Sequence, residues 1–126
     1  MGISVNDVSY QVAVADTPAL RILGLMNVEN LGTLDGMLFV YGEEQDVEHW
    51  MKDTIIPLDI AYFDAQGDLV SVTTMIPCFE GDDCPHYPAE GPSAYAVEVP
   101  VGVFDGLPDD ARLELLEELP GPRGQA

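Results

Sequence analysis

The chain has 126 residues, and its 23 Asp and Glu against four Lys and Arg give a net charge of −19. Such a charge repels nucleic-acid phosphates and anionic lipid, which makes both poor partners. The length predicts one domain, residues 1–126, with a core of about residues 8–119 and a tail of residues 120–126. The apolar fraction of 47% is enough for one ordinary core, and no apolar run of 18 or more residues could span a membrane.

The acidic composition also bears on where the protein works. A near-absence of Lys beside abundant Asp and Glu resembles the proteins of halophiles, because molar salt screens charges within about 3 Å. An acidic mesophilic protein that binds calcium loosely is the alternative. The N-terminus lacks the charged and apolar regions of a signal peptide. The sequence therefore fits a soluble protein, either in the cytoplasm of a high-salt cell or exported with its leader removed.

The first elements are a strand and a short helix. Val8–Ala15 alternates apolar and polar residues, which is typical of a half-buried strand. Asp16-Thr17-Pro18 predicts a helix start, because a capping residue is followed by Pro at the first helical position. Gly24 ends the helix or permits close packing, and we expect Arg21 to point outward.

The middle of the chain predicts four strands. Met37–Tyr41 is a short apolar run typical of a central strand, and Gly42–Asp46 is an acidic turn. Val47–Met51 alternates and predicts the next strand. Leu58–Phe63 and Leu69–Met75 flank an Asp- and Gly-containing turn, which indicates a hairpin.

The last third predicts a long loop followed by strands. Ile76–Ser93 contains four prolines and both cysteines, so we expect a loop without secondary structure, functional or mobile. Ala94–Val99 alternates as a strand, and Pro100–Gly106 allows one helical turn. Asp110–Glu118 fits strand or helix. The sum is an α+β domain whose mixed or antiparallel sheet is rolled into a partly open barrel, with one main short helix.

Cys78 and Cys84 are the only cysteines, with five residues between them. A local disulfide in an oxidising compartment and two free thiols are both open. With His86 they offer at most three zinc ligands, so we predict no metal site and no cofactor.

Several motifs together resemble the bacterial and archaeal family called domain of unknown function 192, or uncharacterised protein family 0127. They are Gly24-Leu25-Met26, Gly36-Met37-Leu38-Phe39-Val40, Trp50-Met51-Lys52-Asp53-Thr54, Ile56-Pro57-Leu58-Asp59-Ile60, Cys84-Pro85-His86-Tyr87 and Tyr95-Ala96-Val97-Glu98-Val99. The resemblance covers about residues 8–103 and implies a compact β-rich α+β fold without an established role. It also favours a strand in the ambiguous segment, through residues 111–115. Members usually carry an Arg soon after Gly-Leu-Met, where this chain has Asn27-Val28-Glu29.

The stretch His49–Ile60 gathers the chemically capable side chains. Trp50 either stacks against a sugar or apolar ligand or anchors the core. Lys52 and Asp53 either pair with each other on the surface or line the site with Trp50. Tyr95 and His86 are further ligand-contact candidates, from a strand and the long loop.

Asp59 and Glu98 are the catalytic candidates, because each is a carboxylate on a strand of otherwise apolar residues. A buried acid must be paired, hydrogen-bonded or protonated. Asp59 either accepts from backbone donors at the Pro57 bend or acts as an acid with a raised pKa. If the two carboxylates converge, they form the pair that glycoside hydrolysis requires.

Three hypotheses follow. The first is a binding module that holds a small or extended polar ligand in a groove, with a carbohydrate as the favoured class. The second is a glycoside hydrolase that uses Asp59 and Glu98. The third is an accessory protein whose groove binds a partner chain. The sequence leaves the oligomeric state open.

Overall fold

The computed structural model describes residues 1–119, and the predicted tail of residues 120–126 lies outside the described residues. This part of the chain is rich in strands and has one short α-helix and one 3₁₀ turn. The elements are β1 (Gly2–Val5), β2 (Val8–Ala15), α1 (Pro18–Leu23), β3 (Gly36–Gln45), β4 (Glu48–Trp50), β5 (Leu58–Phe63), β6 (Leu69–Met75), η1 (Gly81–Asp83), β7 (His86–Pro88), β8 (Ser93–Pro100) and β9 (Leu113–Leu115).

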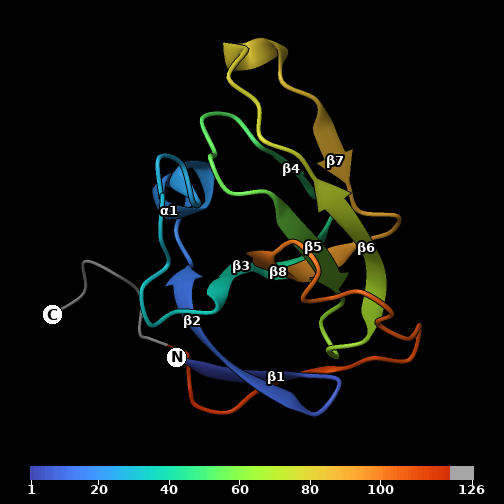
Figure 1. Cartoon of the computed structure of the whole chain (residues 1–126). Coiled ribbons are helices and arrows are strands. Elements are labelled where there is room, and N and C mark those ends of the chain that lie inside the picture. Colours follow the sequence, from blue (N-terminus) through green and yellow to red (C-terminus); the bar gives the residue numbers. More distant parts are fainter. Residues whose placement is uncertain (120–126) are drawn as a thin grey trace, which may run out of the picture.

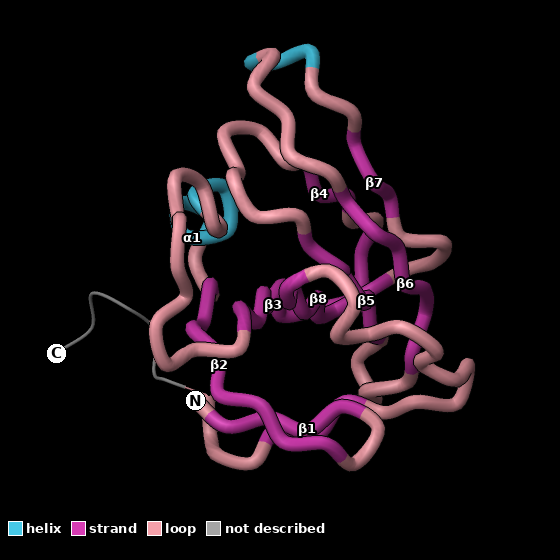
Figure 2. Tube along the Cα trace, in the orientation of Figure 1, coloured by secondary structure: helices cyan, strands magenta, loops and turns pink. Residues whose placement is uncertain are grey.

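Seven strands form one curled sheet in the order β6-β5-β8-β3-β2-β1-β9, and β4 and β7 form a separate ribbon. All neighbouring strands of the large sheet are antiparallel except β2 and β3, which are parallel. In Figures 1 and 2 the central strands β3, β8 and β5 lie in the middle of the molecule, with β1 on one side and α1, β4 and β7 on the other. The predicted β-rich α+β domain with a mixed sheet is confirmed.

The two edges of the curled sheet meet at one corner. The Leu113 N–H donates to the Gly67 carbonyl at 2.8 Å, and the Leu69 N–H donates to the Ala111 carbonyl at 3.2 Å. A Cβ on Gly67 would lie 2.4 Å from the Leu113 carbonyl oxygen, so only glycine permits this approach. The barrel is therefore joined at this corner through the turn between β5 and β6.

Helix α1 forms where the capping signals predict it. Thr17 is the N-cap, and its hydroxyl accepts from the Leu20 N–H at 3.2 Å. Pro18 occupies the first helical turn, and Gly24 ends the helix with φ of 47°. The local sequence thus fixes both ends of a helix that contributes none of its own residues to the fully buried core.

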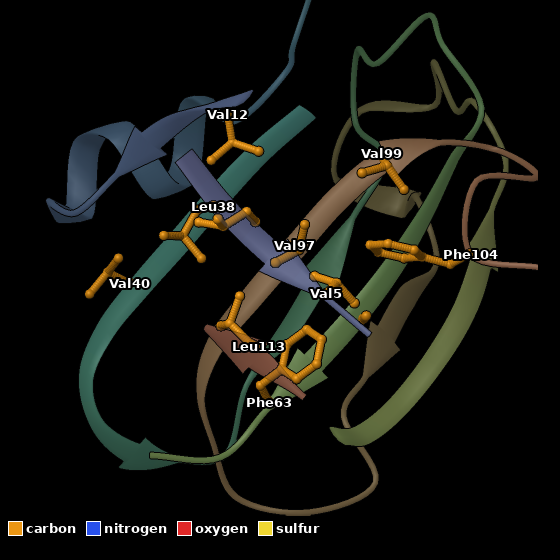
Figure 3. Packing of buried hydrophobic residues seen from close by; sticks show 11 residues of the cluster. Val5, Val12, Leu38, Val40, Phe63, Val97, Val99, Phe104 and Leu113 are labelled. Atoms are coloured by element: carbon orange, nitrogen blue, oxygen red, sulfur yellow. The ribbon is translucent and has the colours of Figure 1, made fainter. Parts of the chain in front are cut away.

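Side-chain alternation along the central strands divides the core into two clusters, one on each face of the sheet. The first cluster fills the interior of the barrel and includes Leu38, Phe63, Val97 and Val99, which point toward one another with Phe104 in Figure 3. The second cluster lies toward α1 and the β4–β7 ribbon. It contains Ala15, Leu25, Phe39, Val47, Met51, Leu58, Ile60, Tyr62, Met75 and Ala96.

Several boundaries differ from the sequence-based predictions. Residues 2–5 form an unpredicted strand between β2 and β9, since four residues are too few to display a period. The predicted acidic turn at Gly42–Asp46 is wrong, because β3 continues through exposed residues to Gln45. The long segment after β6 contains η1 and β7, which pairs with β4. Residues 101–106 form turns rather than a helical turn, and the strand favoured near residue 113 is confirmed.

Candidate functional site

A pocket of about 370 Å³ opens beside the second cluster. Its walls come from α1 and the segment that follows it, and from β3, β4, β7 and β8. In Figure 2, α1, β4 and β7 lie on the same side of the central strands β3 and β8. Aliphatic and aromatic side chains make up most of the walls, and a few polar groups enter them, among them Arg21, Glu48, His49 and Glu98.

Three polar side chains from β3, β4 and β8 form a hydrogen-bonded chain in the pocket wall. His49 Nδ1 lies 2.8 Å from Glu98 Oε2, and His49 Nε2 lies 2.5 Å from the Tyr41 hydroxyl. A carboxylate only accepts, so Nδ1 carries the proton, and in neutral His49 the Nε2 atom accepts from the Tyr41 O–H. The His49 and Glu98 side chains are each only 6% exposed. The cost of burying these polar groups is therefore offset by the hydrogen bonds that link Tyr41, His49 and Glu98.

The imidazole of His49 is fixed by aromatic neighbours as well. Its ring lies 4.5 Å from the Phe39 ring and 5.7 Å from the Tyr62 ring, both in edge-on arrangements. Burial raises the pKa of Tyr41, and Glu98 raises it further while Arg21 opposes the shift. The Tyr41 hydroxyl thus keeps its proton at neutral pH and remains a donor.

Arg21 faces the pocket, so the prediction that it points outward is wrong. Its Nη1 donates to the Val40 carbonyl at 2.9 Å, and its guanidinium carbon lies 5.0 Å from the centre of the Tyr41 ring. The short helix places Arg21 one turn before Gly24, where the chain bends back toward the sheet. Arg21 turns inward because of tertiary contacts: β3 offers the guanidinium a carbonyl that accepts its hydrogen bond and an aromatic ring to lie against.

The predicted ligand-contact residues Trp50 and His86 both line the pocket, and we place its mouth here because His86 is exposed and Trp50 half-buried. Their ring centres are 5.2 Å apart, and the Lys52 ammonium lies 5.1 Å from the Trp50 ring. His86 Nδ1 is 2.9 Å from the Glu48 carboxylate, also at the mouth. Trp50 is half-buried, so part of its ring remains exposed in the pocket wall.

Lys52 and Asp53 do not line the pocket. Lys52 pairs with Asp82 of η1 at 2.8 Å, so the expected pairing with Asp53 is wrong. The pKa of Lys52 is raised, first by the hydrogen bond to Asp82. Asp53 occupies a tight turn with φ of 54°, where its N–H donates to Cys78 and its carbonyl accepts from Asn27.

The loop that carries Asp82 is closed by a disulfide. Cys78 and Cys84 are bonded, with their Cα atoms 5.8 Å apart, which resolves the alternatives left open by the sequence. The backbone of Cys78 also forms isolated β-bridges with Lys52 and Thr54. The disulfide therefore braces the segment that follows Trp50.

Asp59 and Glu98 are not brought together. Ile60 pairs directly with Glu98 across β5 and β8, and Asp59 pairs with Val99, so the two carboxylates point to opposite faces of the sheet. The condition for a carboxylate pair is not met. Tyr95 packs against the first cluster, on the Asp59 face, and likewise lies outside the pocket walls.

The Asp59 carboxylate accepts three hydrogen bonds from groups of the fold itself. Its Oδ1 accepts from the Thr74 hydroxyl at 2.8 Å, and its Oδ2 accepts from the N–H groups of Gly102 and Phe104 at 2.9 and 3.2 Å. Backbone donors do satisfy it, as one alternative held, but they come from the turn after β8 and not from the Pro57 bend. These donors are 43 and 45 residues from Asp59 in sequence, so only folding brings them to its carboxylate.

Sequence reasoning therefore selected Trp50, His86 and Glu98, which line the pocket, and missed the roles of Arg21 and Tyr41 in its walls. The one available signal for Arg21 was the scarcity of cations in the chain. Within residues 1–119 no helix has the length and apolarity to cross a membrane, and no three His, Cys, Asp or Glu side chains cluster as metal ligands would.

Comparison with known proteins bears on the whole domain. A model of the family DUF192, described as "Uncharacterized ACR", matches residues 2–115. The chain belongs to this family. No curated protein matches the sequence.

Two solved structures share the DUF192 fold described above. One is a "putative transcription regulator" from Sinorhizobium meliloti 1021, with 27% identity and a TM-score of 0.81 over 90% of this chain and 91% of that one. The other is a protein of unknown function from Novosphingobium aromaticivorans DSM 12444, with 24% identity and a TM-score of 0.81 over 91% of this chain and 84% of that one. The second likeness shows the fold alone.

Proposed function

We propose that this DUF192 domain is a binding module for a small polar ligand, which occupies the pocket between α1 and the β4–β7 ribbon. The observation that carries the proposal is the pocket itself, since about 370 Å³ lies within the range of small-molecule sites. Apolar walls with a few convergent polar groups are the usual make-up of such sites. The fixed Tyr41–His49–Glu98 chain supports a wall that needs little rearrangement on binding.

We propose a carbohydrate as the first ligand class to test. Trp50 offers a flat aromatic surface beside the mouth, and Glu48 and His86 offer acceptors and donors for hydroxyl groups. Sugars combine an apolar ring face with a polar rim, which suits this combination of side chains.

Binding is preferred to hydrolysis in this proposal. Glycoside hydrolysis needs two carboxyl groups that flank one bond, and the proposed partner of Glu98 lies on the other face of the sheet. We expect no release from chromogenic aryl glycosides at molar salt. Release by wild type that is lost in a folded Glu98→Gln variant would revive the hydrolase alternative.

The name of the Sinorhizobium relative raises a regulatory role, for which we propose effector binding rather than DNA binding. A net charge of −19 opposes association with phosphates, and the chain has only four Lys and Arg. A partner chain that docks over the same mouth is the remaining alternative. It would be indicated if no small molecule bound and a partner were recovered at high salt.

The charge also supports function in concentrated salt. Self-repulsion among 23 acids destabilises the compact state, and salt relieves it. We expect the melting temperature to rise steadily between 0.1 and about 2 M KCl. A melting temperature that is independent of KCl would remove the halophilic part of the proposal.

The pocket is tested with a blocked variant. Met26 lines the pocket and is half-buried, so Met26→Trp should fill it. Val72 is 39% exposed on β6, outside the pocket walls, so Val72→Trp is the matched control. A panel of mono- and oligosaccharides and small aromatic compounds is screened by ligand-observed NMR. We expect saturable binding by wild type and Val72→Trp and its loss in Met26→Trp; equal binding by all three would place the ligand elsewhere.

A further inference from the structure

Arg21 differs from the other side-chain cations of residues 1–119. Lys52 pairs with Asp82 and Arg112 pairs with Asp68, both on the surface. Arg21 forms no ion pair with a carboxylate of these residues, although the chain holds 23 acids. The guanidinium lies instead in the wall of the pocket.

The position of Arg21 is fixed from two sides. Its backbone N–H donates to the Thr17 carbonyl in the capped first turn of α1. Its guanidinium donates to the Val40 carbonyl and lies against the Tyr41 ring. Ordering a long side chain before binding lowers the entropic cost of using it in recognition.

Most of the hydrogen-bonding capacity of this guanidinium is left for a ligand. Arginine has five N–H donors, and the bond to Val40 uses one of them. The neighbouring Tyr41 proton is directed to His49, so it is engaged within the wall. Arg21 is thus the principal donor and the positive charge on this side of the pocket.

We propose that Arg21 binds the carboxylate of a compact, singly charged ligand, for which a sugar acid or an aromatic acid is the class of candidate. The inference rests on the proposed binding function of the same pocket. A planar guanidinium matches a carboxylate through two parallel N–H···O bonds, which gives both affinity and orientation. The aromatic and aliphatic walls then hold the body of the ligand.

The carboxylates in the same walls set the charge of the ligand. Glu98 is bonded to His49 and Glu48 to His86, and both acids line the pocket. A phosphate carries close to two negative charges at pH 7 and would be repelled by these groups more strongly than a carboxylate. The pocket should therefore select a monoanion over a dianion of similar size.

Isothermal titration with matched probes tests the inference, at the lowest KCl concentration at which the protein is folded. Glucuronate is compared with glucose, and phenylacetate with phenylacetamide and phenyl phosphate. We expect one acid to bind wild type at least about tenfold more tightly than its neutral partner, and phenyl phosphate to bind more weakly than phenylacetate. The pair that shows the preference identifies the body of the ligand.

Three variants locate the preference. Arg21→Gln should lose about tenfold in affinity for the acid and almost none for the neutral partner. Arg21→Lys keeps the charge and should retain part of the preference for the acid. If circular dichroism shows that Arg21→Gln is unfolded, Arg21→Lys provides the test instead. Arg112→Gln removes the same charge at an exposed site outside the pocket walls and should bind as wild type does.

The outcomes separate the two proposals. Equal binding of acid and neutral partner, with loss in the pocket-filling Met26→Trp, would overturn the role of Arg21 and leave the binding module standing. A preference that survives in Arg21→Gln would likewise overturn it. Absence of saturable binding by every probe would overturn both.

Discussion

Asp59 and Glu98 are two buried acids on neighbouring strands, one residue apart in register, and their surroundings differ completely. Asp59 faces the interior of the barrel and accepts three hydrogen bonds, two of them from a backbone turn. Glu98 faces the pocket and holds His49, which in turn contacts Tyr41. Burial alone therefore does not distinguish an acid that stabilises a turn from one that lines a pocket. The face of the sheet on which the acid lies makes that distinction.

The same division runs through the whole domain. On the Asp59 face the sheet curls over its own side chains and closes at the Gly67–Leu113 corner. On the Glu98 face the cover consists of a six-residue helix and a two-stranded ribbon braced by the Cys78–Cys84 disulfide. These smaller pieces cannot fill the space above the sheet, and the pocket is the result.

Asp59→Ala should have the largest effect on stability. The change leaves the Gly102 and Phe104 N–H groups and the Thr74 hydroxyl without their acceptor, at a cost of about 4 kcal/mol in the free energy of unfolding. Urea unfolding measures the loss. Asp59→Asn keeps one carbonyl oxygen for the backbone donors and should lose far less; an equal loss in both variants would mean that charge, not hydrogen bonding, is what the turn requires.

High pH should have the second-largest effect on stability, through two tyrosines on the pocket face. Burial raises the pKa of both Tyr41 and Tyr62 above the ordinary value of 10.0. The unfolded chain then releases these protons first, so stability is constant below pH 10 and falls above it, by about 3 kcal/mol in total at pH 11. Chemical unfolding from pH 8 to 11 tests this.

Tyr41→Phe and Tyr62→Phe are the controls for the alkaline loss. Each variant should be less stable at neutral pH but should show a shallower decline above pH 10. An unchanged slope in both would assign the decline to other groups.

The disulfide tests the bracing of the pocket rim. Replacing both Cys78 and Cys84 by Ser should lower the free energy of unfolding by about 2 kcal/mol, the value for a short closed loop. Hydrogen exchange should increase in the β4–β7 ribbon and not around Asp59. Uniformly faster exchange on both faces would contradict the separation of the two regions.

Glu98→Gln should have the smallest effect on folding. The amide oxygen can still accept from His49 Nδ1, so we expect a loss of about 1 kcal/mol. Urea unfolding of the variant beside wild type measures this loss. A loss of unfolding free energy as large as that of Asp59→Ala would show that Glu98, too, is mainly required for folding.

The sequence predicted elements well where the signal was local. Thr17, Pro18 and Gly24 mark both ends of α1, and the apolar run at Met37–Tyr41 lies in the central strand β3. The hairpin of β5 and β6 follows from alternation and its turn. Such patterns depend only on neighbouring residues, so they survive in the folded chain.

The sequence could not reveal contacts between distant segments. Asp59 was recognisable as a buried acid, but its two backbone donors lie 43 and 45 residues away. Glu98 and His49 are 49 residues apart, and no pattern links them. The direction of Arg21 depends on a carbonyl of β3, which a helical wheel does not contain.

One NMR titration tests the central distinction most directly. Amide and indole resonances of the isotope-labelled protein are followed while glucuronate and phenylacetate are added in turn. We predict saturable shifts at Arg21, His49 and Trp50, with none at Gly102 and Phe104 on the Asp59 face. Saturable shifts that centre on the turn beside Asp59, or no saturable shifts at all, would contradict the assignment of the Glu98 face as the binding face.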